Sequence, residues 1–374
     1  MKLRDFELEC FFGKYEFTAP YLLALSDCES MTAGELLALE EGSEKGYLDQ
    51  WLGYTETWGD PELREHIAAL YGPDIAAENV LTLHGAQEGI FLLLNTLLDA
   101  GDHVIVMYPN YPSVEEIAAA IPGVSCSRWE LQDCGERWGL DLDALEGLIR
   151  PETRLLCVNS PNNPTGFTLA DAELDRIAAV CRARGLYLFC DEAYKGLELD
   201  GHPRSWGADR YEKALSLGVM SKAYGLAGLR VGWFASRDRE LLDRMVRMKH
   251  YTTICDAAPS EYLSKIALRH SDALLARSRE IIRRNLLTAD KFFARHRNVF
   301  EQKAIDAGPI AFHKLLLPMP AGEFCDLAVE KKGVLLLPGR VYGTDGPYFR
   351  MGYGRRSFPE NLAKLEEFLE EQGF

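Results

Sequence analysis

The sequence predicts an α/β protein: a mainly parallel, seven-stranded-type sheet with helices on both faces, plus a smaller α+β domain built from both chain ends. Through the middle of the chain, short continuous apolar runs alternate with helical patterns. This alternation is typical of strands buried between two layers of helices. After about residue 285 the sequence pattern changes, and short apolar runs follow one another closely between helical segments. These two observations predict two domains of different architecture.

The expected strands of the large sheet are short, mostly apolar runs. They cover residues 79–83, 103–107, 154–159, 186–190, 214–219 and 231–235. Helical patterns over residues 86–98, 114–120 and 168–184 separate them. Thr168 and Asp171 have the spacing of a capping box at the start of the third helix, and Gly185 is a typical stop for it.

The C-terminal part reads as a smaller α+β unit. A long helix is expected around residues 274–293, and apolar runs follow at 310–317, 334–337 and 348–352. Helices are expected at 323–332 and 359–371, the second opening with a proline. The first residues, with a helix candidate at 32–40, are expected to join this unit. The predicted domains are therefore 45–285, and 1–44 together with 286–374.

Composition excludes several classes of function. The chain has 374 residues and a formal net charge of −16, which disfavours nucleic acid or an anionic membrane as a partner. No window approaches about 18 unbroken apolar residues, and no signal-peptide core is visible. The nine cysteines form no CxxC pair and read as free thiols of a reducing compartment, so a cytoplasmic location is expected. No HExxH, GxSxG or P-loop motif is present, and no metal site is expected.

Polar side chains cluster after the expected strands. In open α/β sheets, sites gather beyond the carboxyl ends of the strands. Four loops contribute there, and their residues are His84–Gln87, Asn162–Gly166, Asp191–Tyr194, and Ser221 with Lys222. Their shared edge predicts one site for a small molecule.

Seven stretches of the sequence, taken together and in this order, indicate a protein family more specifically than any one of them alone. They read GYTETWGDPELREHIA, LHGAQEG, YPNYPS, NSPNNPTG, CDEAYKGL, MSKAYGLAGLRVGW and YFRMGYG. With them the chain resembles the fold-type I enzymes dependent on pyridoxal 5′-phosphate (PLP), in particular the class I/II aminotransferases. The resemblance runs over nearly the whole length. It implies PLP as cofactor, an amino acid as substrate, and a homodimer.

The resemblance assigns the chemistry to Lys222, which is expected to hold PLP as a Schiff base and, once freed, to carry the α-proton. A solvated surface lysine is the alternative, but the apolar strand before it argues against that. Asp191 matches the carboxylate that keeps the pyridine nitrogen protonated, although an Asp after a strand can also cap a helix. Tyr194 and Asn163 match the residues that hydrogen-bond the ring's phenolic oxygen.

The phosphate is expected at a helix start beside a fixed cation. Gly85, Ala86 and Gln87 open the helix, Arg230 is the cation, and Ser221 offers a hydroxyl.

Further family positions concern the ring and a neighbouring subunit. Tyr111 matches the aromatic side chain that stacks on the ring face. Tyr54 matches the tyrosine that reaches the phosphate of the neighbouring subunit, with a core aromatic as the alternative; residues 251–253 are a candidate for the same interface. Val219 departs from the pattern, because many relatives carry serine or threonine there.

Arg350 matches the arginine that binds the substrate α-carboxylate, where Asn163 also lies; alone, it reads equally well as a surface ion-pair residue. The stretch APYLLALSDCES replaces a glycine-containing segment that passes over the substrate in relatives. Asp27 and Glu29 in it suggest a cationic substrate such as arginine or a hydroxylated derivative. Their alternative role is to stabilise the N-terminus of the helix that follows.

The leading functional hypothesis is an aminotransferase that acts on an L-amino acid through 1,3-proton transfer by Lys222. The alternative is elimination, as in C–S lyases, or elimination with ring closure, as in capreomycidine-synthase-like enzymes on a hydroxyarginine. Both use Lys222 and Asp191, and fold alone does not separate them. PLP-sensing transcription regulators are disfavoured, because they carry a DNA-binding module for which this acidic chain has no room.

Overall fold

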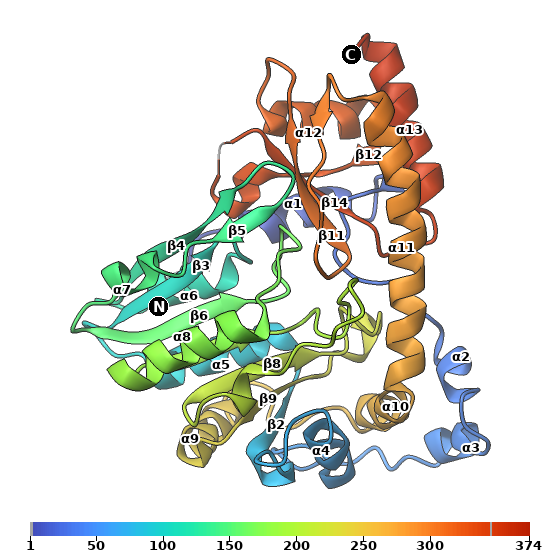
Figure 1. The fold of residues 1–374 in the computed structure, drawn as a ribbon. Helices are drawn as coiled ribbons and strands as arrows, with labels where there is room; N and C mark the ends of the chain where they lie inside the picture. The colour runs from blue at the N-terminus through green and yellow to red at the C-terminus, as the bar shows by residue number, and fades with distance from the viewer. Residues whose placement is uncertain (1–2, 345) are drawn as a thin grey trace.

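The computed structural model describes residues 3–344 and 346–374, and its large sheet has eight strands within those ranges (Figure 1). The strands, in spatial order, are β2 (Val80–Leu83), β9 (Gly232–Ser236), β8 (Ala214–Val219), β7 (Tyr187–Asp191), β6 (Thr153–Asn159), β3 (His103–Tyr108), β4 (Ser125–Asp133) and β5 (Trp138–Leu140). Strands β8, β7, β6, β3 and β4 run parallel, whereas β9 and β5 run antiparallel to their neighbours. The expected mainly parallel sheet is confirmed.

Helices cover both faces of this sheet because its central strands are apolar on both sides. Val104 and Val106 of β3 pack with α5, α6 and α9, while Ile105 and Met107 point to the face that carries α8. These helices and the short α7 are α5 (Ala86–Leu97), α6 (Ser113–Ala120), α7 (Ala144–Leu148), α8 (Asp171–Arg184) and α9 (Arg239–Lys249).

The smaller unit contains a four-stranded sheet in the order β10 (Phe300–Glu301), β11 (Ile310–Leu315), β14 (Tyr348–Gly352) and β13 (Leu337–Pro338), as counted in the described residues. Helices α12 (Ala321–Lys332) and α13 (Phe358–Gln372) complete it. Strand β1 (Tyr21–Leu22) pairs in parallel with β12 (Val334–Leu335), so the segment around Tyr21 lies against the C-terminal part of the chain. The exact domain boundaries stay predictions.

The remaining helices surround these two sheets. They are α1 (Glu7–Tyr15), α2 (Ala33–Leu37), α3 (Ser43–Leu48), α4 (Pro61–Ala68), α10 (Ala258–Arg269), α11 (Ser271–Arg295), and the short 3-10 turns η1 (Ala77–Asn79), η2 (Gly207–Asp209), η3 (Ala227–Leu229) and η4 (Gly339–Tyr342). The long helix α11 runs up one side of the molecule toward the C-terminal sheet (Figure 1). No helix in the described part of the chain is both long and apolar enough to cross a membrane.

Two expectations about local structure were wrong. Helix α8 begins at Asp171 rather than at Thr168, and the Ala170 N–H donates to Glu173 Oε2 at 2.7 Å. The Thr168 hydroxyl instead lies 3.1 Å from Ser160 Oγ, so it is a loop contact and not a cap. The helix expected at 32–40 is the shorter α2, which Thr32 caps.

The N-terminal segment after β1 passes tightly over β14. The Gly352 N–H donates to Leu23 O at 2.7 Å, and a Cβ atom on Gly352 would collide with Leu25 O. Gly354 is equally close to Asp27 O. Two glycines therefore let the N-terminal backbone lie against the C-terminal one, and this contact positions residues 24–29 beside the edge of the large sheet.

Candidate active site

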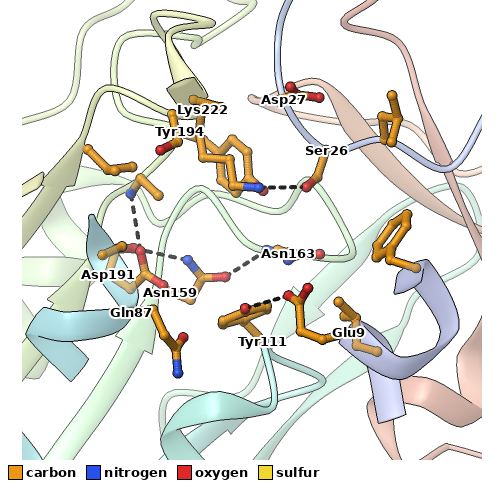
Figure 2. A pocket seen from close by; sticks show the side chains of 18 of the residues that line it. Glu9, Ser26, Asp27, Gln87, Tyr111, Asn159, Asn163, Asp191, Tyr194 and Lys222 are labelled. Atoms are coloured by element: carbon orange, nitrogen blue, oxygen red, sulfur yellow. Dashed lines mark hydrogen bonds between the residues drawn. The ribbon is translucent and has the colours of Figure 1, made fainter. Parts of the chain in front are cut away.

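A cavity of about 480 Å³ opens at the carboxyl edge of the large sheet, beside the N-terminal segment (Figure 2). Eleven of the residues singled out in the sequence line it. They are Asp27, Ala86, Gln87, Tyr111, Asn163, Asp191, Tyr194, Ser221, Lys222, Arg230 and Arg350. The expectation that the loops after separate strands meet at one edge is confirmed.

Lys222 follows β8, and its side chain reaches into the cavity (Figure 2). Its Nζ donates a hydrogen bond to Ser26 Oγ at 2.9 Å. The main-chain Cys28 N–H donates to Lys222 O, which ties the lysine to the N-terminal segment. Desolvation lowers the pKa of Lys222, and nearby Arg350 lowers it further, whereas Asp27 opposes the shift. A neutral amine is therefore accessible closer to neutral pH than for an ordinary lysine.

Asp191 ends β7 and is buried. One carboxylate oxygen accepts a hydrogen bond from the Ala193 N–H at 3.2 Å, and Asn159 Nδ2 donates to the Asp191 backbone carbonyl. Burial raises the pKa of Asp191 to about 6. A buried carboxylate of this kind is stabilised by a cationic partner, and a protonated pyridine nitrogen is one.

Tyr194 supplies a second sign that the cavity accepts a ligand. Its side chain is buried and lines the cavity, and among the described residues its hydroxyl has only a weak contact with Ser26, short of a well-formed hydrogen bond. A buried hydroxyl without a partner is unfavourable, so such groups normally meet a ligand or water. The donor set thus fits a phenolic oxygen as well as a ring nitrogen.

Arg350 is fixed at the far side of the cavity by β14. Its Nε and Nη2 donate to Ala24 O, and its Nη1 lies 2.9 Å from Asn163 Oδ1 and 2.5 Å from Tyr342 Oη. Tyr342 also donates to Asn163 Oδ1 at 2.8 Å. The guanidinium is buried and has no acidic partner among the described side chains. A charge buried in this way favours binding of an anion such as a carboxylate.

The opposite end of the cavity suits a phosphate. Arg230 Nη1 donates to Ser221 Oγ at 3.2 Å, and the described part of the chain offers Arg230 no ion pair. Gly85, with φ +81°, caps α5, and a Cβ on it would displace the Arg230 guanidinium. This glycine therefore leaves the space in which the cation sits beside a helix N-terminus.

Neighbouring residues complete that end. Ala86 and Gln87 open α5 and line the cavity, with Gln87 Nε2 donating to Ser113 Oγ at 2.7 Å. Val219 lines it too and presents an apolar side chain to it.

Tyr111 connects the cavity to helix α1. Its hydroxyl donates to Glu9 Oε1 at 2.9 Å, and its ring centroid lies 5.2 Å from that of Phe6 (Figure 2). Burial raises the pKa of Tyr111, and the neighbouring Glu9 raises it further, so this phenol stays protonated as the donor.

Three predicted residues do not line the cavity: Gly85 at the start of α5, Tyr54 and Glu29. Tyr54 is 83% exposed, beside Leu52 on a different part of the surface, so it is not a core aromatic. Glu29 accepts a hydrogen bond from the Arg356 N–H at 2.7 Å and does not line the cavity, which corrects the expectation that both acids face it.

Asp27 does line the cavity, and it forms an ion pair with Arg355 at 2.6 Å. The alternative role of Asp27 and Glu29 as caps of the following helix was wrong as well. Helix α2 is capped by Thr32 and Glu35 in a capping box.

Five polar residues of the cavity or its network were not foreseen: Glu9, Glu16, Ser26, Asn159 and Tyr342. Asn159 accepts from the Asn163 N–H at 2.7 Å, and its place at a strand end was the signal that could have found it. The other four come from segments without a motif. No group of three or more metal-binding side chains occurs among residues 3–344 and 346–374.

Comparisons with known proteins agree with this geometry. The family model described as aminotransferase class I and II matches residues 36–369. Capreomycidine synthase of Streptomyces vinaceus is 30% identical over 97% of this chain and 93% of its own length. A PLP-dependent aminotransferase structure from Streptococcus suis has a TM-score of 0.92 at 29% identity, covering 99% of both chains. The structure of the PLP-dependent cyclase OrfR has a TM-score of 0.90 at 26% identity, covering 100% of this chain and 98% of that one.

Proposed function

Since the chain belongs to the aminotransferase class I and II family, we propose that it moves the α-proton of an L-amino acid with Lys222 and transfers the amino group. Its cofactor is PLP, which when bound accepts the electron pair left at the substrate α-carbon. The observation that carries the proposal is the single cavity in which the Lys222 amine, the buried Asp191 carboxylate and the unneutralised Arg350 lie together.

Each end of the cofactor has a matching group in this proposal. Arg230, Ser221 and the N–H groups that open α5 would hold the phosphate. Asp191 would hold the ring nitrogen, and Tyr111 would cover the ring face. The residues for the phenolic oxygen would be Asn163 and Tyr194, the second of which has a hydroxyl that makes no well-formed hydrogen bond with a described residue.

The substrate is oriented by Arg350, which takes its α-carboxylate in the proposed complex. Lys222 Nζ takes the α-proton, and its lowered pKa keeps part of the amine neutral and ready to accept it. Ser26 Oγ, 2.9 Å from that nitrogen, directs the amine before the transfer. Phe6, Phe12 and Leu25 line the cavity and exclude water from the reacting atoms. Return of the proton by Lys222 completes the 1,3-transfer that leads to a 2-oxo acid.

Elimination, with or without ring closure, is the second candidate. It begins with the same proton removal by Lys222, and differs only in the loss of a β or γ group from the substrate. The whole-length similarity to capreomycidine synthase and to the cyclase OrfR favours keeping it.

We further propose a homodimer in which Tyr54 reaches the site of the neighbouring subunit. Large side chains near it are unusually exposed; they are Leu48, Trp51, Leu52, Tyr54 and Tyr251, with exposed fractions between 74% and 90%. Thr55 Oγ1 donates to Asp256 O at 2.8 Å, which holds the segment around Tyr54 against residues 251–257. An apolar surface of this kind suits a subunit interface.

The test combines cofactor trapping with a substrate panel. Protein loaded with PLP is reduced with borohydride, and mass spectrometry is expected to locate the adduct on Lys222, to lose it in Lys222→Ala, and to keep it in the control Lys213→Ala. Wild type is then mixed with single amino acids. Release of a 2-oxo acid with the amine form of the cofactor supports transfer, whereas ammonia or a cyclic product supports elimination. An unmodified Lys222 would refute the proposal. Sedimentation of the same protein measures the dimer.

A further inference from the structure

The charges that line the cavity do not cancel once the cofactor and the α-carboxylate have their partners. The charged lining residues are Glu9, Glu16, Asp27, Asp191, Lys222, Arg230 and Arg350. Asp191, Lys222 and Arg230 serve the cofactor in the proposed function, and Arg350 serves the carboxylate. Asp27 is neutralised by Arg355. Two carboxylates, those of Glu9 and Glu16, are left over.

Both leftover acids lie on one face of the N-terminal helix. Glu9, Phe12 and Glu16 are three and four residues apart, the spacing that aligns side chains along a helix, and all three line the cavity. Glu16 is the C-cap residue of α1. The helix therefore presents an aromatic ring flanked by two acids to the cavity.

Neither acid has a cation of its own in the described part of the chain. Glu9 accepts from the Tyr111 hydroxyl, a neutral donor that leaves its charge in place. The Glu16 side chain makes no hydrogen bond or ion pair among the described residues. Its pKa is raised, first by desolvation and then by Asp27 and Glu9, while Lys222 and Arg355 oppose the shift. Glu16 thus lies in the field of the neighbouring acids and is stabilised by an incoming cation.

Phe12 links this face to the carboxylate site. The Arg350 guanidinium lies 5.7 Å from the centroid of the Phe12 ring, which stands between the two acids along α1. A substrate whose α-carboxylate meets Arg350 therefore has its side chain beside this face. The buried Tyr194 hydroxyl in the same cavity, which makes no well-formed hydrogen bond with a described residue, independently supports a ligand in this space.

We propose that Glu9 and Glu16 select an amino acid with a cationic side chain, of the arginine or lysine type. This rests on the proposed function and names its substrate class. The pair replaces the earlier candidates from the sequence, because Asp27 is neutralised and Glu29 lies outside the cavity. The same charges repel a second carboxylate, so glutamate, aspartate and their 2-oxo acids are poor ligands of this site.

The experiment compares L-arginine with L-citrulline, which has almost the same shape without the charge. Both are titrated into PLP-loaded enzyme and followed by calorimetry and by cofactor absorbance, with L-glutamate as the anionic member. Arginine is expected to bind at least about tenfold more tightly than citrulline, and glutamate more weakly than either. In Glu16→Gln and in Glu9→Gln, the arginine-to-citrulline ratio is expected to fall at least about tenfold. Glutamine at position 9 can still accept the hydrogen bond from the Tyr111 hydroxyl. The variant therefore removes the charge of Glu9 without removing this contact.

Glu7→Gln is the matched control, because Glu7 is an acid of the same helix that does not line the cavity. Its ratio is expected to equal that of wild type. Equal binding of arginine and citrulline by wild type, or an unchanged arginine-to-citrulline ratio in both variants, overturns this inference. The proposed function still stands in that case if citrulline reacts. A protein that traps PLP on Lys222 but responds to no amino acid overturns both.

Discussion

Replacing Asp191 with asparagine is expected to stabilise the cofactor-free protein while weakening cofactor binding. In the protein without cofactor, the carboxylate is buried at the end of β7 with the Ala193 N–H as its donor. Asparagine keeps the oxygen that accepts this bond but carries no charge. The variant therefore removes the free-energy cost of a buried charge and, in the loaded protein, also removes the partner of the ring nitrogen.

The size of the effect follows from the pKa. Burial raises the pKa of Asp191 from 3.8 to about 6, and about two pKa units correspond to about 3 kcal/mol. Because the folded-state pKa lies above the unfolded one, the folded protein binds this proton more tightly, and stability is lost as the pH rises from about 4 through about 6. The advantage of Asp191→Asn should therefore grow from about 1.5 kcal/mol at about pH 5 to about 3 kcal/mol at about pH 8.

Urea denaturation of both cofactor-free proteins between these two pH values measures the advantage directly. The exposed Asp49 provides the control, since Asp49→Asn should show no such growth with pH. PLP titration of the same samples should show weaker binding by Asp191→Asn, by about tenfold or more. Parallel pH profiles for wild type and Asp191→Asn, or a variant less stable than wild type at about pH 8, would refute the reasoning.

Two further predictions concern the phosphate end and the core. Gly85→Ala should weaken PLP binding by about tenfold or more, because the added Cβ would displace the Arg230 guanidinium. The control is Gly101→Ala, since Gly101 has φ +98° but open space around it. This variant should show backbone strain and normal PLP binding. Lys249→Met should lower the free energy of unfolding by about 3–5 kcal/mol in urea, because it leaves the buried Asp256 carboxylate, 3.0 Å from the amine, without its cation. A loss below about 1 kcal/mol would contradict this, and Lys249→Met combined with Asp256→Leu should recover part of it.

The large sheet could be predicted from sequence because its central strands are buried on both faces and read as continuous apolar runs. Strand β4 has no such run, since only Trp129 and Leu131 of its nine residues are buried, and it is absent from the expectations. The short β5 depends on pairing with β4. Strands at or next to the edge of the sheet that face solvent carry too weak an apolar signal to be recognised from one sequence.

The chemical centre of the site could also be predicted, because Asp191 and Lys222 follow buried strands within distinctive motifs. The substrate side could not. Glu9 and Ser26 reach the cavity only through the packing of the N-terminal segment, and neither lies in a motif. Asp27 and Glu29 are two residues apart, but the chain bends at Asp27 and only this residue remains at the cavity.

The tight passage of the N-terminal segment over β14 has a consequence for biosynthesis. Ala24 and Arg350, which donates to its carbonyl, are 326 positions apart, so the segment around Ala24 can make this contact only after Arg350 has been synthesised. Until then Leu23 and Leu25 have no cover, and contacts of such long range form late. The nascent enzyme should therefore acquire the ability to bind amino acids only after Arg350 has been synthesised, and a truncation before Arg350 should yield a chain that can neither fix the segment around Ala24 nor orient a substrate.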